Sequence, residues 1–300
     1  MDGRLGAAVL TGNEYRFGKN WGCSITVAQT LPEKKRAWRM VYQSYLEKGY
    51  AKIDSDELWY GLYDMLPQTT TFIASRDGID VATLTVVFDS EFGVPADQLY
   101  HDELDRMRQD GRRICEIVSL ASNESDRRQG IEVLKHLFNV GFHMASKLVD
   151  ATDFIITVNP HHASYYERKL LFRRHGEERS YAKVGGAPAV LLVLDLTTAN
   201  ERYLDEYGPD NGSLWHHFFS ERTASSTVWF LVENVNRGGR QELMGWFRRK
   251  KPAVLERLGN HISPFDAARE AQLRQSAACA PLGLARDPSA GEVRDGILMA

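Results

Sequence analysis

The octapeptide Ile114-Cys115-Glu116-Ile117-Val118-Ser119-Leu120-Ala121 decides how this chain folds and where its chemistry lies. Apart from Glu116 and Ser119 it is apolar on both alternating faces, a pattern typical of a strand buried on both sides. A carboxylate there loses its water and must be paired or protonated. Because either outcome shifts its pKa, Glu116 is a candidate active-site acid. The alternative is a structural Glu paired with an Arg.

The segments on either side of the octapeptide predict a mixed α/β domain. A polar loop, residues 122–129, leads into a helix and a short apolar strand, and a β-hairpin with a turn at Arg76-Asp77-Gly78 precedes it. The predicted order is helix, hairpin, helix, strand, helix, strand, helix, strand, strand. This order indicates an α/β fold with a mixed, mostly antiparallel sheet flanked by helices.

Composition and net charge limit the classes of function that the chain can have. The chain has 300 residues, 43% hydrophobic and 26% charged, which is enough for a sizeable core. Its net charge of -3 provides no global field for nucleic acid or anionic membranes. The three cysteines form no CxxC pair, so neither a disulfide framework nor a metal site is expected. With no signal peptide or spanning segment in view, we expect a cytoplasmic protein, with peripheral membrane contact left open.

Shifts in composition suggest four regions. Residues 1–29 are Gly-rich and are expected to form a loose arm, and residues 30–198 form the α/β domain. Residues 199–266 are rich in aromatic residues and predict a helical C-terminal extension. Residues 267–300 are Ala-, Gly- and Arg-rich, which favours a disordered tail.

An ordered set of short motifs resembles a known family. The motifs are Arg36-Ala37-Trp38-Arg39-Met40-Val41-Tyr42, Thr69-Thr70-Thr71-Phe72, the Glu116 octapeptide, Val158-Asn159-Pro160-His161-His162, Tyr165-Tyr166 and Gly186-Ala187-Pro188-Ala189-Val190. Together they resemble the long-chain N-acyl amino acid synthases, including the N-acyltyrosine synthases. These belong to the GNAT acyltransferase superfamily and are similar to the acyl-homoserine-lactone synthases. The resemblance covers roughly residues 28–198 and implies a GNAT-like acyltransferase fold.

The resemblance implies transfer of a fatty acyl group from an acyl carrier protein thioester to the α-amine of an amino acid. No tightly bound cofactor is implied, and acyl-ACP or acyl-CoA would be the co-substrate. GNAT enzymes that use coenzyme A cradle its pyrophosphate with a loop containing two small residues. Here Arg127-Arg128-Gln129-Gly130-Ile131-Glu132 supplies one Gly, which favours the carrier protein. Arg127 and Arg128 either meet an acidic carrier or are solvated loop charges.

Amide formation from a thioester assigns roles to the central strand. Glu116 is the candidate base for the incoming amine, and Ser119 with the backbone amides around Val118 and Leu120 would stabilise the oxyanion. Tyr166 occupies the place of a general-acid Tyr in many GNAT enzymes. Packing roles are the alternatives for Ser119 and Tyr166.

Two further side chains are candidates for substrate binding. Arg39 on the first helix could bind the amino acid carboxylate with two parallel hydrogen bonds. Trp59 could form one wall of a pocket for an acyl chain or an aromatic side chain. In the C-terminal region, aromatic residues beside Arg248-Arg249-Lys250-Lys251 suit an anionic lipid surface, a carrier-protein face, or packing on the core.

Two other functions are compatible with parts of the sequence. The first is a coenzyme A-dependent GNAT enzyme that acylates another amine, and the incomplete phosphate loop argues against it. The second is a non-catalytic, acyl-binding GNAT-like module, which gains nothing from a desolvated acid such as Glu116. Neither the acceptor nor the oligomeric state follows from the sequence.

Overall fold

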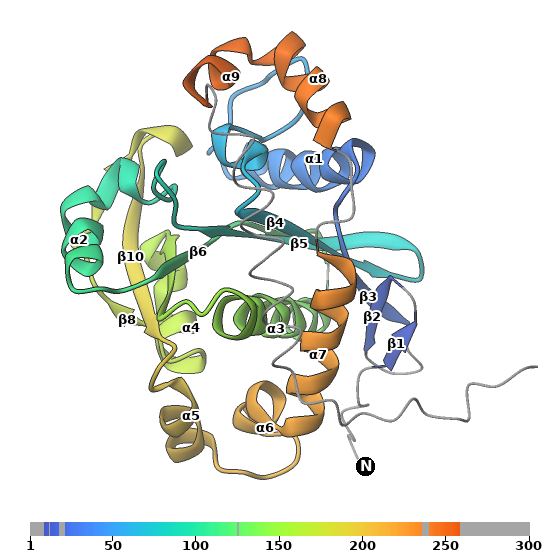
Figure 1. Cartoon of the computed structure of the whole chain (residues 1–300), viewed down its shortest axis with the longest axis vertical. Helices are drawn as coiled ribbons and strands as arrows, with labels where there is room; N and C mark the ends of the chain where they lie inside the picture. The colour runs from blue at the N-terminus through green and yellow to red at the C-terminus, as the bar shows by residue number, and fades with distance from the viewer. Residues whose placement is uncertain (1–8, 12, 18–21, 125, 236–239, 259–300) are drawn as a thin grey trace, which may run out of the picture.

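The computed structural model describes residues 9–11, 13–17, 22–124, 126–235 and 240–258. They form one ten-stranded sheet with helices on both faces (Figure 1). The strands are β1 (Val9–Thr11), β2 (Glu14–Phe17), β3 (Cys23–Val27), β4 (Thr69–Arg76), β5 (Ile79–Phe88), β6 (Ile114–Ser122), β7 (Asp153–Val158), β8 (Arg173–Arg174), β9 (Arg179–Tyr181) and β10 (Ala187–Asp195). The helices that pack on them are α1 (Leu31–Glu47), α2 (Asp97–Gln109), α3 (Arg127–His143) and α4 (Pro160–Lys169).

The sheet is mixed and mostly antiparallel, as predicted. Its order is β1-β2-β3-β4-β5-β6-β7-β10-β8, with β9 paired to β10. Only β6 and β7 run parallel among the paired strands of the described chain. The predicted hairpin is confirmed as β4 and β5, joined through Asp77 and Gly78, both of which have positive φ.

Alternation along β6 divides its side chains between the two layers. Cys115 and Ile117 point into the large core beneath α3, while Ile114 points towards α2 on the opposite face. Glu116 lies on the α2 face and is 2% exposed. Burial of apolar groups on both sides accounts for the unbroken hydrophobic character of this strand in the sequence.

The N-terminal region differs from the expected loose arm. In its described part, β1, β2 and β3 extend the sheet from the edge of β4. Tyr15, Phe17 and Ile25 are completely buried, and Val27 is nearly so. These residues do alternate with a period of two, but the strands are too short for the pattern to stand out among glycines.

The predicted C-terminal helical extension is present, and it covers both faces of the sheet (Figure 1). Its first three helices, α5 (Ala199–Tyr207), α6 (Leu214–Phe219) and α7 (Glu221–Asn234), pack on the α3 side through Tyr203, Phe218 and Phe230. The last two, α8 (Arg240–Lys250) and α9 (Pro252–Leu258), pack on the α1 side. The predicted tail, 267–300, lies outside the described residues.

The aromatic residues of α8 face inward. Phe247 is completely buried against Trp38, and Trp246 lies against Tyr60. The α8 aromatics therefore pack on the domain, and packing on the core is the alternative that the structure supports for this segment. Among the described helices, none combines the length and apolarity that a bilayer crossing requires.

Candidate active site

A cavity of about 330 Å³ opens where β6 and β7 separate. The parallel ladder between them ends at Ile117 and Ile156, and both strands continue beyond it. Aromatic side chains make up much of the wall, namely Tyr45, Tyr50, Trp59, Tyr60, Tyr63, Tyr166 and Tyr181. The end of the ladder leaves backbone on this edge of β6 facing the cavity, which an extended ligand can approach.

Glu116 is the buried acid of this cavity. Its Oε2 accepts a 2.7 Å hydrogen bond from the Ala96 N–H, and its Oε1 lies 3.5 Å from Thr157 Oγ1. Burial raises the pKa of Glu116 to about 8, while the Ala96 bond and the positive charge of Lys183 act to lower it. Among the described residues its hydrogen-bond partners are thus a backbone amide and a hydroxyl, and no arginine pairs with it.

A β-bulge follows Glu116 on the same strand. Thr85 pairs with Val118 and Thr83 pairs with Ala121, so two residues of β6 stand opposite one residue of β5. One of the two, Ser119, has a φ of 51°. Backbone strain of this kind, in a residue other than glycine, is often found where a chain is shaped for function.

Lys183 and Asp64 also line the cavity, although no sequence pattern predicts them as site residues. Asp64 accepts hydrogen bonds from the Gly61 N–H (2.7 Å) and Trp38 Nε1 (2.8 Å), and burial raises its pKa. Lys183 is exposed as a residue, yet burial of its ammonium lowers its pKa, and Asp64 and Glu116 counteract this. Lys183 lies in a turn between β9 and β10, where no sequence pattern marks it.

Six of the residues proposed from sequence line the cavity: Trp59, Glu116, Val118, Ser119, Leu120 and Tyr166. Tyr166 is 8% exposed, and its ring packs beside Phe138 and Phe172. Burial raises its pKa, so the hydroxyl keeps its proton at neutral pH.

Arg39 does not lie at the cavity. It is exposed and lines a separate groove with Lys35 and Arg249, between α1 and α8. The buried face of α1 carries Ala37, Trp38 and Val41, which turns Arg39 away from Glu116. The assignment of Arg39 as a carboxylate ligand is therefore wrong for this cavity.

The start of α3 is closed by its own N-cap. Asp126 accepts hydrogen bonds from the N–H groups of Arg128 (2.8 Å) and Gln129 (3.1 Å). Arg128 is exposed and does not line the cavity, and the side chain of Arg127 is outside the described residues. Two of the amides that could bind a phosphate at this helix terminus are already satisfied by a carboxylate.

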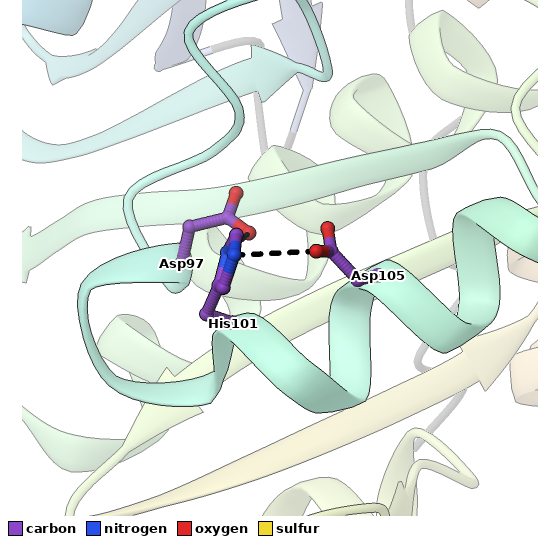
Figure 2. Close-up of side chains that lie close together, drawn as sticks. All are labelled: Asp97, His101 and Asp105. Atoms are coloured by element: carbon purple, nitrogen blue, oxygen red, sulfur yellow. Dashed lines mark ion pairs between the residues drawn. The ribbon is translucent and has the colours of Figure 1, made fainter.

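One cluster of potential metal ligands lies on α2, where Asp97, His101 and Asp105 converge (Figure 2). Arg108 already forms ion pairs with both carboxylates, at 2.6 Å from Asp97 and 2.8 Å from Asp105. His101 is largely exposed. The cluster is thus an arginine-centred ion-pair network at the surface, and it does not line the cavity.

Comparisons with known proteins identify the family. The family model described as N-acyl amino acid synthase FeeM matches residues 36–195, more than half of the chain. The solved structure of FeeM, from uncultured soil microbes, is 24% identical with a TM-score of 0.55, and the match covers 61% of this chain and 96% of that one.

Two more distant structures were also found. One is an acyl-CoA N-acyltransferase from Pseudomonas aeruginosa, with 16% identity and a TM-score of 0.40, and the match covers 57% of this chain and 98% of that one. The other is the AHL synthase LasI, with 15% identity and a TM-score of 0.43, and the match covers 59% of this chain and 93% of that one. No curated protein sequence matches. The family expected from the motifs is confirmed: this chain belongs to the FeeM family of N-acyl amino acid synthases and is an acyltransferase with the GNAT fold.

Proposed function

We propose that this enzyme transfers a long-chain fatty acyl group from the phosphopantetheine thioester of an acyl carrier protein to the α-amine of an amino acid. The observation that carries the proposal is the position of Glu116. A carboxylate with a pKa of about 8 lies in the cavity where β6 and β7 separate. A base is most effective when its pKa lies near the working pH.

In the first step Glu116 removes a proton from the amine of the amino acid, directly or through water. The amine nitrogen then attacks the thioester carbonyl, and a C–N bond forms. Lys183 would assist by holding part of the Glu116 population ionised, because its positive charge lowers the pKa of that carboxyl. Burial works in the opposite direction and strengthens the base.

Negative charge then develops on the carbonyl oxygen. The bulge at Ser119 supports an oxyanion site built from the backbone N–H groups of Val118 to Leu120, since these residues line the cavity beyond the end of the β6–β7 ladder. The Ser119 hydroxyl is a second potential donor. Collapse of the intermediate breaks the C–S bond, and the leaving thiolate takes a proton from Tyr166. The products are an N-acyl amino acid and the free thiol of the carrier.

The N-terminus of α3 supports a carrier protein as the donor. The Asp126 carboxylate occupies amides at this terminus and places negative charge where a coenzyme A pyrophosphate would need positive potential. A phosphopantetheine arm carries a single phosphate and therefore requires less positive potential at this site. Arg127 and Arg128 would meet the acidic surface of the carrier.

The test is a comparison of donors with the purified protein. A long-chain acyl carrier protein and the matching acyl-CoA are each incubated with a mixture of amino acids, and products are identified by mass spectrometry. We expect N-acyl amino acids from the carrier protein at a kcat/KM at least tenfold above that of acyl-CoA. Equal or better use of acyl-CoA would overturn the assignment of the donor. Acylation of other amines in preference to amino acids would overturn the acceptor.

A further inference from the structure

The C-terminal extension packs against the outer side of a segment that lines the cavity. Residues 58–66, here called the roof segment, contribute Trp59, Tyr60 and Tyr63 to the cavity. Their outer side is covered by α8 and α9 through a shared apolar cluster that comprises Leu58, Tyr60, Met65, Leu66, Leu243, Phe247 and Leu258. The extension therefore fixes the roof segment in place, although residues 240–258 lie far from it in sequence.

Polar contacts tie α9 to the same roof. Lys251, just before α9, donates a 2.6 Å hydrogen bond from Nζ to the Tyr60 carbonyl, and its ammonium lies 4.0 Å from the centre of the Tyr60 ring. At the other end of α9, Leu258 is completely buried. With both ends held, α9 has a defined position against the cavity.

Arg257, next to Leu258, lines the same cavity as Glu116. Its positive charge acts to lower the pKa of Tyr63, which burial and then the charges of Glu116 and Asp97 raise. Within the described part of the chain, no carboxylate forms an ion pair with Arg257. The guanidinium is exposed and stands at the cavity as a cation, and no hydrogen-bond acceptor among the described residues occupies its donors.

The other cationic side chains in the described cavity wall are lysines that already have polar or charged neighbours. Lys48 donates a 3.1 Å hydrogen bond to Ser44 Oγ, and Lys183 is balanced by Asp64 and Glu116. Arg39, the guanidinium expected from sequence, lies in another groove. Among the residues that the structure describes, Arg257 is thus the guanidinium that lines the cavity.

We propose that Arg257 binds the carboxylate of the amino acid acceptor; this rests on the proposed function and assigns the second charged group of its substrate. An acceptor with its amine at Glu116 must present its carboxylate to a cation, and the planar fork of Arg matches a carboxylate with two parallel hydrogen bonds. The family match ends at residue 195. Recognition of the acceptor therefore depends on an extension beyond the part of the chain that defines the family.

The experiment uses the full chain and a matched acceptor pair, L-tyrosine and tyramine, which differ only in the carboxylate. Rates are measured for the wild type, Arg257→Ala and Arg257→Lys, with Arg249→Ala in the separate groove as control. We expect Arg257→Ala to raise the KM for tyrosine by about 10- to 100-fold and to leave the KM for the acyl donor and the rate with tyramine unchanged. Arg257→Lys should recover part of the loss, because it keeps the charge.

Titration calorimetry of tyrosine binding without acyl donor provides a readout independent of turnover. Arg257→Ala should weaken binding by the same factor, and thermal unfolding should show that the variant remains folded. An unchanged preference for tyrosine over tyramine in Arg257→Ala, or unchanged tyrosine binding, would overturn this inference and leave the acyl transfer intact. A wild type that binds tyrosine through Arg257 but forms no N-acyl product would overturn the proposed function instead.

Discussion

The backbone N–H of Ala96 donates a 2.7 Å hydrogen bond to the carboxylate of Glu116. Ala96 is the N-cap of α2, so the helix directs its positive end at the buried acid. This contact partly offsets the desolvation that raises the pKa of Glu116. The outcome is a carboxyl group that titrates close to physiological pH in the cavity of an acyltransferase.

Glu116→Gln should lower kcat by about 10²- to 10⁴-fold, because the amide cannot accept the proton of the amine. The fold should persist, since the amide oxygen can still accept the bond from Ala96. Steady-state rates and thermal unfolding of the variant measure both effects, with exposed Glu178→Gln as the matched control. A folded variant with near-normal kcat would remove Glu116 from the mechanism.

The pH dependence of activity should follow ionisation of Glu116. Because the base acts in its ionised form, kcat/KM should rise with pH and level off above a midpoint of about 8. Lys183→Met should move this midpoint upward, since Lys183 lowers the pKa of Glu116. Lys169→Met, exposed on α4 and away from the cavity, should leave it in place. A profile that is flat between pH 6 and 9 would contradict the assignment.

Stability should respond to pH in the opposite sense at this site. The folded-state pKa of Glu116 is raised above the unfolded value of 4.5, so its contribution is fully present below pH 4.5 and is lost as pH rises through about 8. Denaturant unfolding of the wild type and Glu116→Gln across this window should differ in slope, with the variant losing less stability as pH increases. Parallel curves would mean that Glu116 titrates at its ordinary pKa.

Replacement of Ser119 tests the role of its strained backbone in the bulge. Ser119→Gly should stabilise the protein by about 1 kcal/mol, because glycine adopts the φ of 51° without strain. Ser119→Val should destabilise it and reduce turnover, since a β-branched residue resists this conformation. Chemical denaturation measures the first effect and kcat the second. If Ser119→Val kept wild-type stability and kcat, the bulge would have no role in catalysis.

Tyr166→Phe should keep the ring contacts with Phe138 and Phe172 and remove the proton donor for the thiolate. We expect kcat to fall by at least about tenfold with little change in stability. Tyr165→Phe is the matched control, because Tyr165 is adjacent on α4 but does not line the cavity. Equal kcat values for the two variants would assign Tyr166 to packing alone.

Local patterns predicted most of the elements correctly. The hairpin, the β6 strand and the helical extension each depend on residues close together in sequence, where periodicity and turn residues carry the information. The N-terminal strands were missed because β3 pairs with β4, more than forty positions away along the chain, and β2 and β1 are added in turn to the outer edge of β3. Burial of Tyr15 and Phe17 is a consequence of that pairing.

For the site, the sequence alone identified Glu116, because a charged residue in an apolar strand is conspicuous wherever the strand lies. The surroundings of Glu116 were decided by tertiary structure: Ala96 comes from α2, Lys183 from the turn before β10 and Arg257 from the C-terminal extension. Arg39 was misplaced for the same reason, since helical spacing shows which residues share a face but not what that face meets. Electrostatic interactions act through space, and only the folded chain determines which distant charges share a cavity.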